Sequence, residues 1–381
     1  MKADKQPPIF FIKKKFSPYG GAENYLATVM NTLRKHYEIT VLAGQWEEAE
    51  GIKTLKIPSP KLGSFMSVVS FNRNVCNFLK NLPASENRIV ISFERTTCQD
   101  IYRAGEGCHA EWLGIRSLTE PWHKKLSFHW NPLHRAILGI EKKLFLNTRF
   151  IIANSRMVKN NIMKHYAVPR EKISVIYNGV DLNRFHPGNK TICRNSMRKQ
   201  LMLPPDIKAL LFVGSGFERK GLATLIKAVG ILKRKDVKVL VAGKGDRMPF
   251  ESKLKKYGLQ DTFIFLGIRK EIEKLYAAAD IFVLPTLYDP FSNATLEAMA
   301  SGLPVLTTGN NGAAELIKNG QEGFVIGSPF DAQELSIQIE NTIGNITCMG
   351  EKAGRKAAGF PIEKAAAQFM EILDRAQKIK D

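Results

Sequence analysis

The sequence has no long hydrophobic run and few cysteines, and each shortage excludes a class of protein. No stretch of about 18 consecutive apolar residues occurs, so a transmembrane helix is not expected. The first apolar run, Ile9–Ile12, is far shorter than the roughly 7–15 residues of a secretory signal core, and is predicted to be a strand. The five cysteines are scattered without a CxxC pair. We therefore expect structural cysteines, no disulfide framework, no zinc site and a reducing compartment.

Acidic residues are scarce relative to basic ones. The 381 residues include 56 Lys and Arg against 36 Asp and Glu, a formal net charge of +20. The first 190 residues hold 29 basic and 15 acidic residues, so +14 of the excess lies there and +6 in the remainder. Such a charge favours nucleic acid, an anionic membrane surface or phosphorylated substrates as partners. Its uneven distribution indicates that the two halves face different partners.

Short apolar runs alternate with helical patterns along the chain. The runs predicted to be strands are Pro8–Ile12, Glu38–Ala43, Thr54–Ile57, Arg88–Phe93, Phe150–Ala153, Ile173–Tyr177, Lys208–Gly214, Val237–Ala242, Phe263–Leu266, Ile281–Pro285, Pro304–Thr307 and Gly323–Ile326. Helical patterns lie between them, as at Glu23–Lys35, Gly221–Lys233 and Ala294–Ser301. Such alternation is typical of parallel sheets covered by helices. It occurs on both sides of a polar joint at His186–Asn195, so the sequence predicts an α/β protein with two tandem Rossmann-like domains, 1–187 and 188–360.

The loop after the first predicted strand contains Gly20 and Gly21 just before a helical pattern. Paired glycines let backbone N–H groups approach an anion, and the helix N-terminus adds its dipole. A flexible turn explains the pair equally well. The loop is neither a GxGxxG fingerprint nor a Walker loop, which disfavours a nicotinamide cofactor and an ATPase.

Arg219 and Lys220 follow the first predicted strand of the second half, at the entry to a helix. The planar fork of arginine and the compact charge of lysine together suit a diphosphate. A solvated basic turn is the alternative in so basic a chain. Because open parallel sheets bind ligands at the carboxyl ends of their strands, the position favours the diphosphate.

Two carboxylates, Asp289 and Glu297, lie around the start of the predicted helix Ala294–Ser301. A carboxylate accepts two hydroxyl hydrogen bonds at once, which is how a ribose or hexose diol is held. Complementing the helix dipole explains Glu297 equally well.

These motifs together resemble the retaining glycosyltransferases of family 4. Asp289, seven further residues, Glu297 and then the sequence AMASGLPV resemble the family's nucleotide-sugar motif. Other pieces agree in order over nearly the whole chain: GGAE at Gly20–Glu23, Asn154–Ser155, NGVDLNRF at Asn178–Phe185, ERKG at Glu218–Gly221 and AAADIFVLPT at Ala277–Thr286. Within the family the sequence is most similar to the lipopolysaccharide core α-1,3-glucosyltransferase type, through Gln45–Glu47, Asp100–Glu111 and Gly214–Ser215.

The resemblance implies a fold and an assignment of domains. The fold is GT-B, with two Rossmann-like domains facing a central cleft; the acceptor binds to 1–187 and the sugar nucleotide to 188–360. The family's last helix returns to the first domain. The amphipathic tail at Pro361–Lys380 fits this role, so residues 361–381 are expected to pack there.

The resemblance also assigns roles to single residues. Donor binding falls to Gly20, Gly21, Arg219, Lys220, Asn293, Ala294 and Glu297. Among these, Glu297 matches the ribose-binding glutamate and Arg219 with Lys220 the diphosphate-binding pair. The residues expected to be catalytic are Glu106, His109, Arg219, Lys220 and Asp289.

In the first half, Glu106 would orient the acceptor hydroxyl, and His109 would bond the donor sugar or the leaving phosphate. Simple solvation is the alternative for both. Arg184 is expected either to meet a phosphate of the acceptor or to pair with Asp181. The family usually has Glu at the position of Asp289 and Asp at that of Glu106. Because of these two departures, the resemblance defines the reaction type more closely than it defines the donor sugar and the acceptor.

The implied reaction moves a hexose, glucose of UDP-glucose in the first place, to a heptose or other sugar hydroxyl of a lipopolysaccharide core or similar glycolipid. Retention would come from front-face attack, with the departing phosphate oxygen helping to deprotonate the acceptor. Retaining hydrolases use a carboxylate nucleophile instead. Arg219, Lys220 and loop amides would stabilise the leaving diphosphate. No DxD cluster occurs in a suitable loop, so neither a metal nor another cofactor is expected.

The segment Trp112–Arg149 contains Trp112, Trp122 and Trp130, with seven basic and two acidic residues. This mixture suits binding in the headgroup plane of an anionic bilayer; a lid over the acceptor site or an aromatic core is the alternative. We therefore expect a cytoplasmic protein, peripheral on the inner face of the cell membrane.

Two other functions compete with sugar transfer. A basic nucleic-acid-binding protein would explain the charge, but no helix-turn-helix, zinc-finger or RNP motif occurs, so no nucleic-acid partner is expected. A sugar-nucleotide epimerase would keep the fold and need no acceptor.

Overall fold

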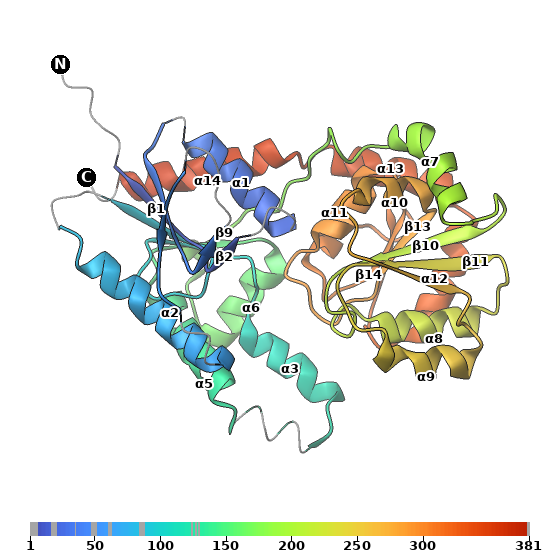
Figure 1. The fold of residues 1–381 in the computed structure, drawn as a ribbon, viewed down its shortest axis with the longest axis horizontal. Helices are drawn as coiled ribbons and strands as arrows, with labels where there is room; N and C mark the ends of the chain where they lie inside the picture. Colours follow the sequence, from blue (N-terminus) through green and yellow to red (C-terminus); the bar gives the residue numbers. More distant parts are fainter. Residues whose placement is uncertain are drawn as a thin grey trace. The chain divides into compact units, whose positions relative to one another are not determined.

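The computed structural model describes residues 7–16, 21–34, 36–46, 52–59, 63–83, 88–122, 125, 128 and 130–378. The chain forms two compact units, Met1–Tyr177 with Glu363–Asp381, and Asn178–Ile362. Each is built on a parallel sheet flanked by helices (Figure 1). The predicted α/β class with two tandem parallel-sheet domains is therefore confirmed.

The first unit contains a seven-stranded sheet in the order β5-β3-β1-β6-β7-β8-β9. Its strands are β1 (Ile9–Ile12), β3 (Ile39–Ala43), β5 (Lys53–Lys56), β6 (Ile89–Ser92), β7 (Ile101–Ala104), β8 (Phe150–Ala153) and β9 (Ile173–Val175). A separate parallel pair joins β2 (Lys15–Phe16) to β4 (Gln45–Trp46). The helices are α1 (Gly21–Leu33), α2 (Gly63–Lys80), α3 (His109–Thr119), α5 (Pro132–Asn147), α6 (Arg156–Tyr166) and α14 (Ile362–Gln377), with a 3₁₀ turn at Arg170–Lys172.

The central strands of this sheet are apolar throughout because helices cover both faces. All four residues of β1 and of β6 are buried. Helix α2 packs Phe71 and Val75 onto one part of the sheet, and α5 packs Leu144 and Phe145 onto another. On the opposite face lie α1 and α14 (Figure 1).

The second unit contains a six-stranded parallel sheet in the order β12-β11-β10-β13-β14-β15. Its strands are β10 (Lys208–Val213), β11 (Val237–Ala242), β12 (Phe263–Gly267), β13 (Ile281–Leu284), β14 (Val305–Thr308) and β15 (Gly323–Ile326). Its helices are α7 (Asn189–Gln200), α8 (Leu222–Leu232), α9 (Met248–Tyr257), α10 (Ile272–Ala278), α11 (Asn293–Ala300), α12 (Ala332–Ile343) and α13 (Ile346–Ala357), with a 3₁₀ turn at Gly312–Leu316.

The C-terminal helix α14 lies in the first unit from Glu363 onward, where the family resemblance places the last helix. Phe369 is fully buried and stacks on Phe93 with ring centroids 6.2 Å apart. Near the end of α14, the hydroxyl of Tyr37 donates a hydrogen bond of 3.2 Å to Gln377. The first unit is thus completed by the last residues of the chain.

The polar joint expected at His186–Asn195 is not where the units divide. The division falls between Tyr177 and Asn178, and residues from Asn189 form α7. Two basic side chains of this segment are bonded inside the second unit: Lys190 donates to the carbonyl of Gly302 at 2.8 Å, and Arg194 pairs with Asp280 at 2.6 Å.

All twelve predicted strands are present, but β7 and the two short strands β2 and β4 were not predicted. The sequence of β7, IYRA, has an arginine within an otherwise apolar run. Arg103 is only 4% exposed and lies over the ring of Phe93, 5.8 Å from the centroid. A buried charge therefore concealed a central strand of the sheet.

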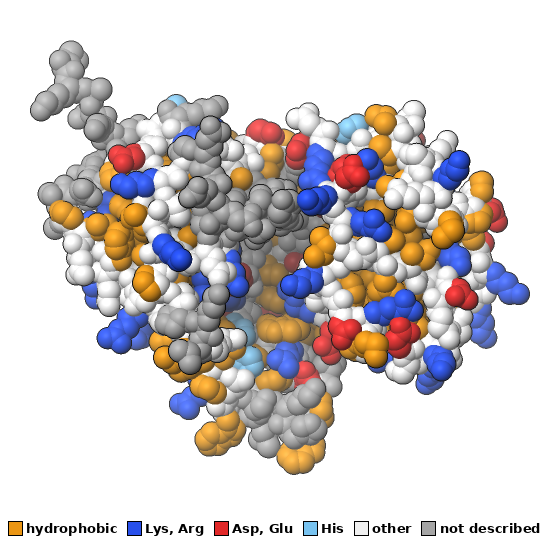
Figure 2. Space-filling view, viewed as in Figure 1, with side chains coloured by type: hydrophobic (Ala, Val, Ile, Leu, Met, Phe, Trp, Pro, Cys, Tyr) orange, Lys and Arg blue, Asp and Glu red, His pale blue; other side chains and the backbone are white. Residues whose placement is uncertain are grey.

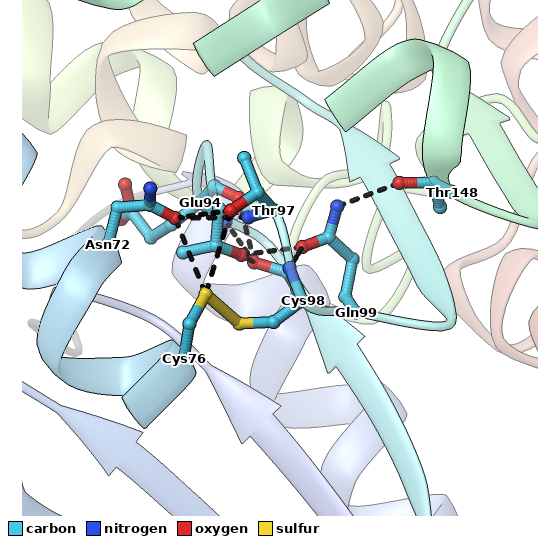
Figure 3. Close-up of a disulfide and its surroundings, with 9 residues drawn as sticks. Asn72, Cys76, Glu94, Thr97, Cys98, Gln99 and Thr148 are labelled. Atoms are coloured by element: carbon cyan, nitrogen blue, oxygen red, sulfur yellow. Dashed lines mark hydrogen bonds between the residues drawn. A yellow bond between two sulfur atoms is a disulfide. The ribbon is translucent and has the colours of Figure 1, made fainter. Parts of the chain in front are cut away.

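The expectation of no disulfide is wrong for Cys76 and Cys98, which are bonded to each other (Figure 3). They are 22 residues apart in sequence, but α2 packs beside the end of β6 and brings their Cα atoms to 5.5 Å, within the range a disulfide needs. The remaining cysteines, Cys108, Cys193 and Cys348, are free thiols. The inference of a reducing compartment rested on the expected lack of disulfides, and the bonded pair removes that support.

The loop that contains Cys98 is fixed on two sides (Figure 3). The amide N–H of Thr97 donates to the side chain of Asn72 on α2 at 3.0 Å. The side chain of Gln99 donates to the hydroxyl of Thr148, the C-terminal cap of α5, at 2.8 Å. The backbone after β6 is thereby held between α2 and α5.

Candidate active site

In the second unit, the loops after three neighbouring strands converge. β10, β13 and β14 are adjacent and parallel, so their carboxyl ends meet at one edge of the sheet. The following loops are residues 214–221, 285–292 and 309–311. The first two contain the predicted residues Arg219, Lys220 and Asp289.

Lys220 and Asp289 form an ion pair, with side chains only 11% and 8% exposed. The backbone of Asp289 is also bonded to the third loop, because its N–H donates to the carbonyl of Asn310 and its carbonyl accepts from the N–H of Gly312, both at 2.9 Å. A buried ion pair adds little net stability, since desolvation offsets the attraction. It does hold an ammonium group at the strand ends, where an anion could replace the carboxylate as its partner.

Arg219 is clamped through its backbone. Its carbonyl accepts hydrogen bonds from the N–H of Leu287 at 2.9 Å and the hydroxyl of Thr286 at 3.1 Å. Its guanidinium makes one long bond, 3.4 Å, to the carbonyl of Tyr288. Among the described residues this engages one of five N–H donors, so most remain available to a ligand.

Gly221 lets the first loop pack closely against the second. Its φ is +82°, and a Cβ there would lie 1.9 Å from the carbonyl oxygen of Pro285. Only glycine satisfies both conditions. This close backbone contact, which a side chain at position 221 would prevent, places Arg219 and Lys220 just before α8.

Helix α11 begins at Asn293, with Ser292 as its N-cap; the hydroxyl of Ser292 accepts from the N–H of Thr295 at 3.3 Å. The amides of Asn293 and Ala294, both expected to reach the donor, belong to the first turn, where N–H groups lack intrahelical acceptors. The side chain of Asn293 accepts a hydrogen bond of 2.6 Å from Asn178. The N-terminus of α11, the end of a helix that favours negative charge, thus adjoins the strand ends.

Asn311 organises this helix start and was missed by sequence reasoning. It is 1% exposed; its oxygen accepts from the N–H groups of Ser292 and Ala313, each at 3.1 Å. Its amide nitrogen donates to the hydroxyls of Thr295 and Thr307, each at 3.0 Å. A lone Asn in a loop carries no pattern that would reveal such a role.

Glu297 lies in α11 and is bonded to Tyr276 of α10. The tyrosine hydroxyl donates to Oε2 of Glu297 at 2.9 Å and also contacts the carbonyl of Ala294 at 3.2 Å. Burial raises the pKa of Glu297, while the Tyr276 hydrogen bond and the nearby Arg184 oppose the shift. The expected ribose-binding carboxylate is thus oriented by a buried tyrosine that the sequence did not single out.

The guanidinium of Arg184 does not pair with Asp181, which was one of its two predicted contacts. Its side chain pairs with Glu273 at 2.8 Å and donates to the carbonyl of Lys270 at 2.7 Å. Asp181 instead accepts from the backbone N–H of Arg184, at 3.2 Å. The guanidinium therefore serves the second unit's own structure, beside α10.

In the first unit, charged residues gather after three neighbouring strands. Lys13 follows β1, Glu94 and Arg95 follow β6, and Glu106 follows β7. Lys13 and Glu94 pair at 3.1 Å. Burial raises the pKa of Glu94, and the carboxylate of Glu106 raises it further, against the opposing effect of Lys13.

Glu106 and His109 lie in one network. Glu106, whose side chain is 43% exposed, forms an ion pair with Arg95. Arg95 also bonds Glu141 at 2.8 Å, and both oxygens of Glu141 accept from the backbone N–H of His109, at 2.9 and 3.1 Å. Arg95 and Glu141 were not predicted, and they connect the two residues that were.

The imidazole of His109 is neutral at neutral pH. Burial, together with Arg95, His134 and Arg116, lowers its pKa to about 4. Its Nε2 lies 3.1 Å from Nδ1 of His134 on α5. A neutral ring of this kind can donate one N–H and accept one hydrogen bond.

The remaining predictions concern the glycine pair, metal ions and membrane-spanning helices. Gly20 lies outside the described residues, whereas Gly21 is the first residue of α1. Within the described part of the chain, no cluster of three or more His, Cys, Asp or Glu is arranged to hold a metal ion. None of the described helices combines the length and hydropathy required to span a bilayer.

The end of the first unit that contains α3 exposes large apolar side chains (Figure 2). Leu118, Trp122 and Trp130 are 74%, 74% and 77% exposed. Phe128, between the two tryptophans, is buried beneath the guanidinium of Arg116, 4.7 Å from its ring centroid. The segment is therefore anchored at Phe128; Trp122 and Trp130 face outward, whereas Trp112 is half-buried beside Arg116.

Comparison with known proteins accounts for both units. Residues 19–184 match the model of "Glycosyltransferase Family 4", and residues 194–347 match "Glycosyl transferases group 1". The two parallel-sheet units and the matched domains define a glycosyltransferase of the GT-B class. The chain thus contains a glycosyltransferase family 4 domain in its first unit and a glycosyltransferase group 1 domain in its second unit.

Individual relatives differ in how much of the chain they match. An uncharacterized glycosyltransferase, MJ1607 of Methanocaldococcus jannaschii, is 33% identical over 46% of this chain and 46% of its own length. Lipopolysaccharide glucosyltransferase WaaG of Escherichia coli K12 is 25% identical over 86% of this chain and 87% of its own.

Solved structures share the whole architecture. A crystal structure of WaaG, described as a glycosyltransferase involved in lipopolysaccharide biosynthesis, covers 94% of this chain and 98% of its own with a TM-score of 0.80 at 24% identity. Anabaena Alr3699/HepE in complex with UDP-glucose covers 97% of this chain and 100% of its own, with a TM-score of 0.73 at 20% identity. At these identities the similarity establishes the fold.

Proposed function

We propose that this protein is a retaining hexosyltransferase that moves glucose from UDP-glucose to a sugar hydroxyl, a heptose in the first place, of a lipopolysaccharide core or similar glycolipid. The second unit would bind the nucleotide sugar and the first unit the acceptor. The closest support for the reaction is the family; the donor and acceptor follow from WaaG, a lipopolysaccharide glucosyltransferase, and from HepE, whose structure contains UDP-glucose.

The observation that carries this proposal is the cluster at the strand ends of the second unit. It combines two cations, Arg219 and Lys220, with the N-terminus of α11 and the carboxylate of Glu297. Cations and helix amides suit a diphosphate, and a carboxylate held by Tyr276 suits a ribose diol. A nucleoside diphosphate sugar has both groups.

The reaction would proceed by binding the diphosphate and stabilising it as it leaves. The incoming phosphate would replace Asp289 as the partner of Lys220, which frees Asp289 to accept hydrogen bonds from hydroxyls of the hexose. Arg219, Lys220 and the α11 amides would then stabilise the developing negative charge electrostatically. A phosphate oxygen on the front face would help to deprotonate the acceptor hydroxyl.

The first unit would supply the acceptor side. Glu106, partly exposed and ion-paired with Arg95, would orient the acceptor hydroxyl. Neutral His109 would donate a hydrogen bond to the donor sugar or the leaving phosphate. By the family resemblance, Gly20 and Gly21 would bring backbone amides to the donor phosphates.

Membrane binding would use the exposed end of the first unit. Trp122, Trp130 and Leu118 offer apolar insertion, and Lys125, Lys142 and Lys143 are exposed basic residues of the same segment. Such a surface suits the anionic inner face of the cell membrane, where a glycolipid acceptor would be presented.

A donor panel tests the proposal. Purified protein is given UDP- or GDP-linked hexoses with heptose-containing core lipid, and nucleotide diphosphate release and the anomeric configuration of the product are measured. UDP-glucose consumption with an α-linked product supports it. Isomerised donor without acceptor would indicate an epimerase, and stabilisation by single-stranded oligonucleotides but by no sugar nucleotide would indicate a nucleic-acid-binding protein.

A further inference from the structure

Glu141 is a buried carboxylate that no sequence motif singled out. It lies in the middle of α5 with its side chain 0% exposed. Its hydrogen bonds reach three other elements: Nε of Arg95 after β6 at 2.8 Å, the N–H of His109 at the start of α3 at 2.9 Å, and the hydroxyl of Tyr166 at the end of α6 at 2.6 Å. One side chain thus joins four segments of the first unit.

A buried carboxylate is costly to place unless its lone pairs are satisfied. Glu141 meets this condition, because three donors share its two oxygens. The same interaction serves α3, since an N-terminal N–H group that would otherwise lack an acceptor is bonded to a negative charge. The beginning of α3, and with it the position of His109, therefore depends on Glu141.

Arg95 carries the effect of Glu141 to Glu106. Its Nε bonds Glu141 while its Nη1 bonds Glu106, so one rigid guanidinium plane connects a buried carboxylate to a partly exposed one. Burial opposes the charge on Arg95, but the two carboxylates outweigh it, and the pKa of the guanidinium lies above its ordinary value. Arg95 is therefore permanently charged, and its orientation is fixed from the buried side.

The backbone near Arg95 is anchored separately. Cys98 is bonded to Cys76, and Gln99 to Thr148, so the loop is held when a single side chain contact is removed. Losing the Glu141–Arg95 bond would release the guanidinium without releasing the loop. The side chain relay can accordingly be tested apart from the fold.

We propose that Glu141 is a positioning residue for sugar transfer: through Arg95 it sets the carboxylate of Glu106, and through the first turn of α3 it sets His109. This proposal rests on the acceptor role given to Glu106 above. Glu141 does not touch substrate, and its effect is on turnover rather than on binding of the nucleotide sugar to the second unit.

The test compares Glu141→Gln with Glu171→Gln, which changes an exposed glutamate of the same unit. Gln keeps the shape of the side chain but removes the charge that faces Arg95. We expect Glu141→Gln to lower kcat about 10-fold, since small misplacements of reacting groups cost up to about 100-fold. The KM for the donor should stay within about 2-fold, and Glu171→Gln should behave as wild type.

A double-mutant cycle separates positioning from general damage. If Glu141 acts partly through Glu106, then Glu106→Gln combined with Glu141→Gln should lower kcat by less than the product of the two single effects, the remaining loss being the effect on His109. Independent effects would multiply and overturn the relay. Equal kcat of Glu141→Gln and wild type would overturn the proposal outright.

Arg95→Lys provides a second variant, chosen in case Glu141→Gln does not fold. Lysine retains the charge but cannot bond two carboxylates in one plane, so kcat should again fall about 10-fold. Combined with Glu106→Gln, it should lower kcat by less than the product of the two single effects. An unchanged kcat in a folded Arg95→Lys protein would contradict the relay. If wild-type protein binds UDP-glucose and transfers nothing to any acceptor, the proposed function fails and Glu141 loses its assigned role with it.

Discussion

The hydroxyl of Tyr276 donates a hydrogen bond of 2.9 Å to Oε2 of Glu297, linking α10 to α11 beneath the predicted donor site. Burial raises the pKa of Glu297, and this hydrogen bond stabilises the charged form. The other charged groups that affect Glu297 are Arg184, which favours the charged form, and Glu273, which disfavours it. Nucleotide binding should therefore depend on pH through this carboxyl.

The first prediction concerns Tyr276→Phe. A carboxylate grips the ribose diol only when ionised, so UDP affinity should fall as pH decreases through the raised pKa of Glu297. Removing the hydroxyl deletes a hydrogen bond that stabilises the charged form, so it should raise that pKa further and move the acid limb of UDP binding to higher pH. Calorimetric Kd values between about pH 5 and pH 8 would measure this. An acid limb that does not move would contradict it.

The raised pKa of Glu297 also affects the stability of the folded protein. Since the folded pKa of Glu297 lies above its unfolded value, the folded state binds the proton more tightly. This contribution is present at low pH and is lost as pH rises through the folded pKa, and Glu297→Gln should remove that loss. The free energy of unfolding measured against pH would reveal it.

The second prediction separates the two carboxylates of the donor motif. Glu297→Ala should weaken UDP binding by about 1.5–3 kcal/mol, the contribution of a charged hydrogen bond. Asp289→Ala should reduce turnover with less effect on UDP affinity, because it frees Lys220 for the phosphate. Asp289→Asn is its matched control, since it removes the charge and keeps the shape. If Glu297→Ala binds free UDP as wild type does, the ribose role is wrong.

The third prediction concerns metal ions. Charge stabilisation is assigned to Arg219, Lys220 and the α11 amides, so transfer should persist in excess EDTA. Lys220→Met should lower kcat at least about 100-fold, as the loss of an electrostatic stabiliser does. Activity that vanishes with chelator and returns with Mg²⁺ or Mn²⁺ would refute the assignment.

The fourth prediction concerns lipid. Flotation with vesicles should require anionic lipid and fall at high salt, because each basic residue near the surface contributes about 1 kcal/mol that salt screens. Trp122→Ser with Trp130→Ser should weaken binding at any salt concentration. Ile192→Ser, which changes a side chain 74% exposed on the second unit, is the control and should float as wild type does. Equal flotation on neutral vesicles would refute the electrostatic part.

The fifth prediction concerns the disulfide. Closing a loop of 22 residues restricts the unfolded chain, so Cys76→Ala with Cys98→Ala should lower the free energy of unfolding by about 3 kcal/mol. Dithiothreitol should produce the same loss in wild type and none in the double variant. Cys348→Ala changes an exposed free thiol and should be neutral. A wild-type unfolding midpoint indifferent to reductant would contradict the prediction.

The strands and the loops that follow them were predictable because the signals are local. An apolar run such as Val237–Ala242 identifies a buried strand by itself, and the basic pair Arg219–Lys220 stands directly after another. Strand β7 was hidden because Arg103 breaks its apolar pattern. One tertiary contact that accompanies its burial is with the ring of Phe93.

The residues that organise the site were not predictable for a related reason. Glu141 stands in the sequence GIEKKL, which reads as an ordinary solvated helix face, and its partners lie 46 and 32 residues earlier and 25 later. Tyr276 belongs to an apolar helical pattern, and nothing local indicates that its hydroxyl meets Glu297 21 residues later. Such roles exist only once distant segments have met.

The discontinuity of the first unit has a consequence for synthesis. Its core includes Phe369, which leaves the ribosome after the entire second unit has been made. During synthesis the ring of Phe93 therefore lacks Phe369, on which it stacks in the folded protein, until residues 178–362 have been translated. Since domains generally fold as units in the order of their synthesis, this chain inverts the rule: the unit begun first is finished last. Deleting residues 363–381 would leave the first unit with an open apolar face and would remove no residue of the second unit.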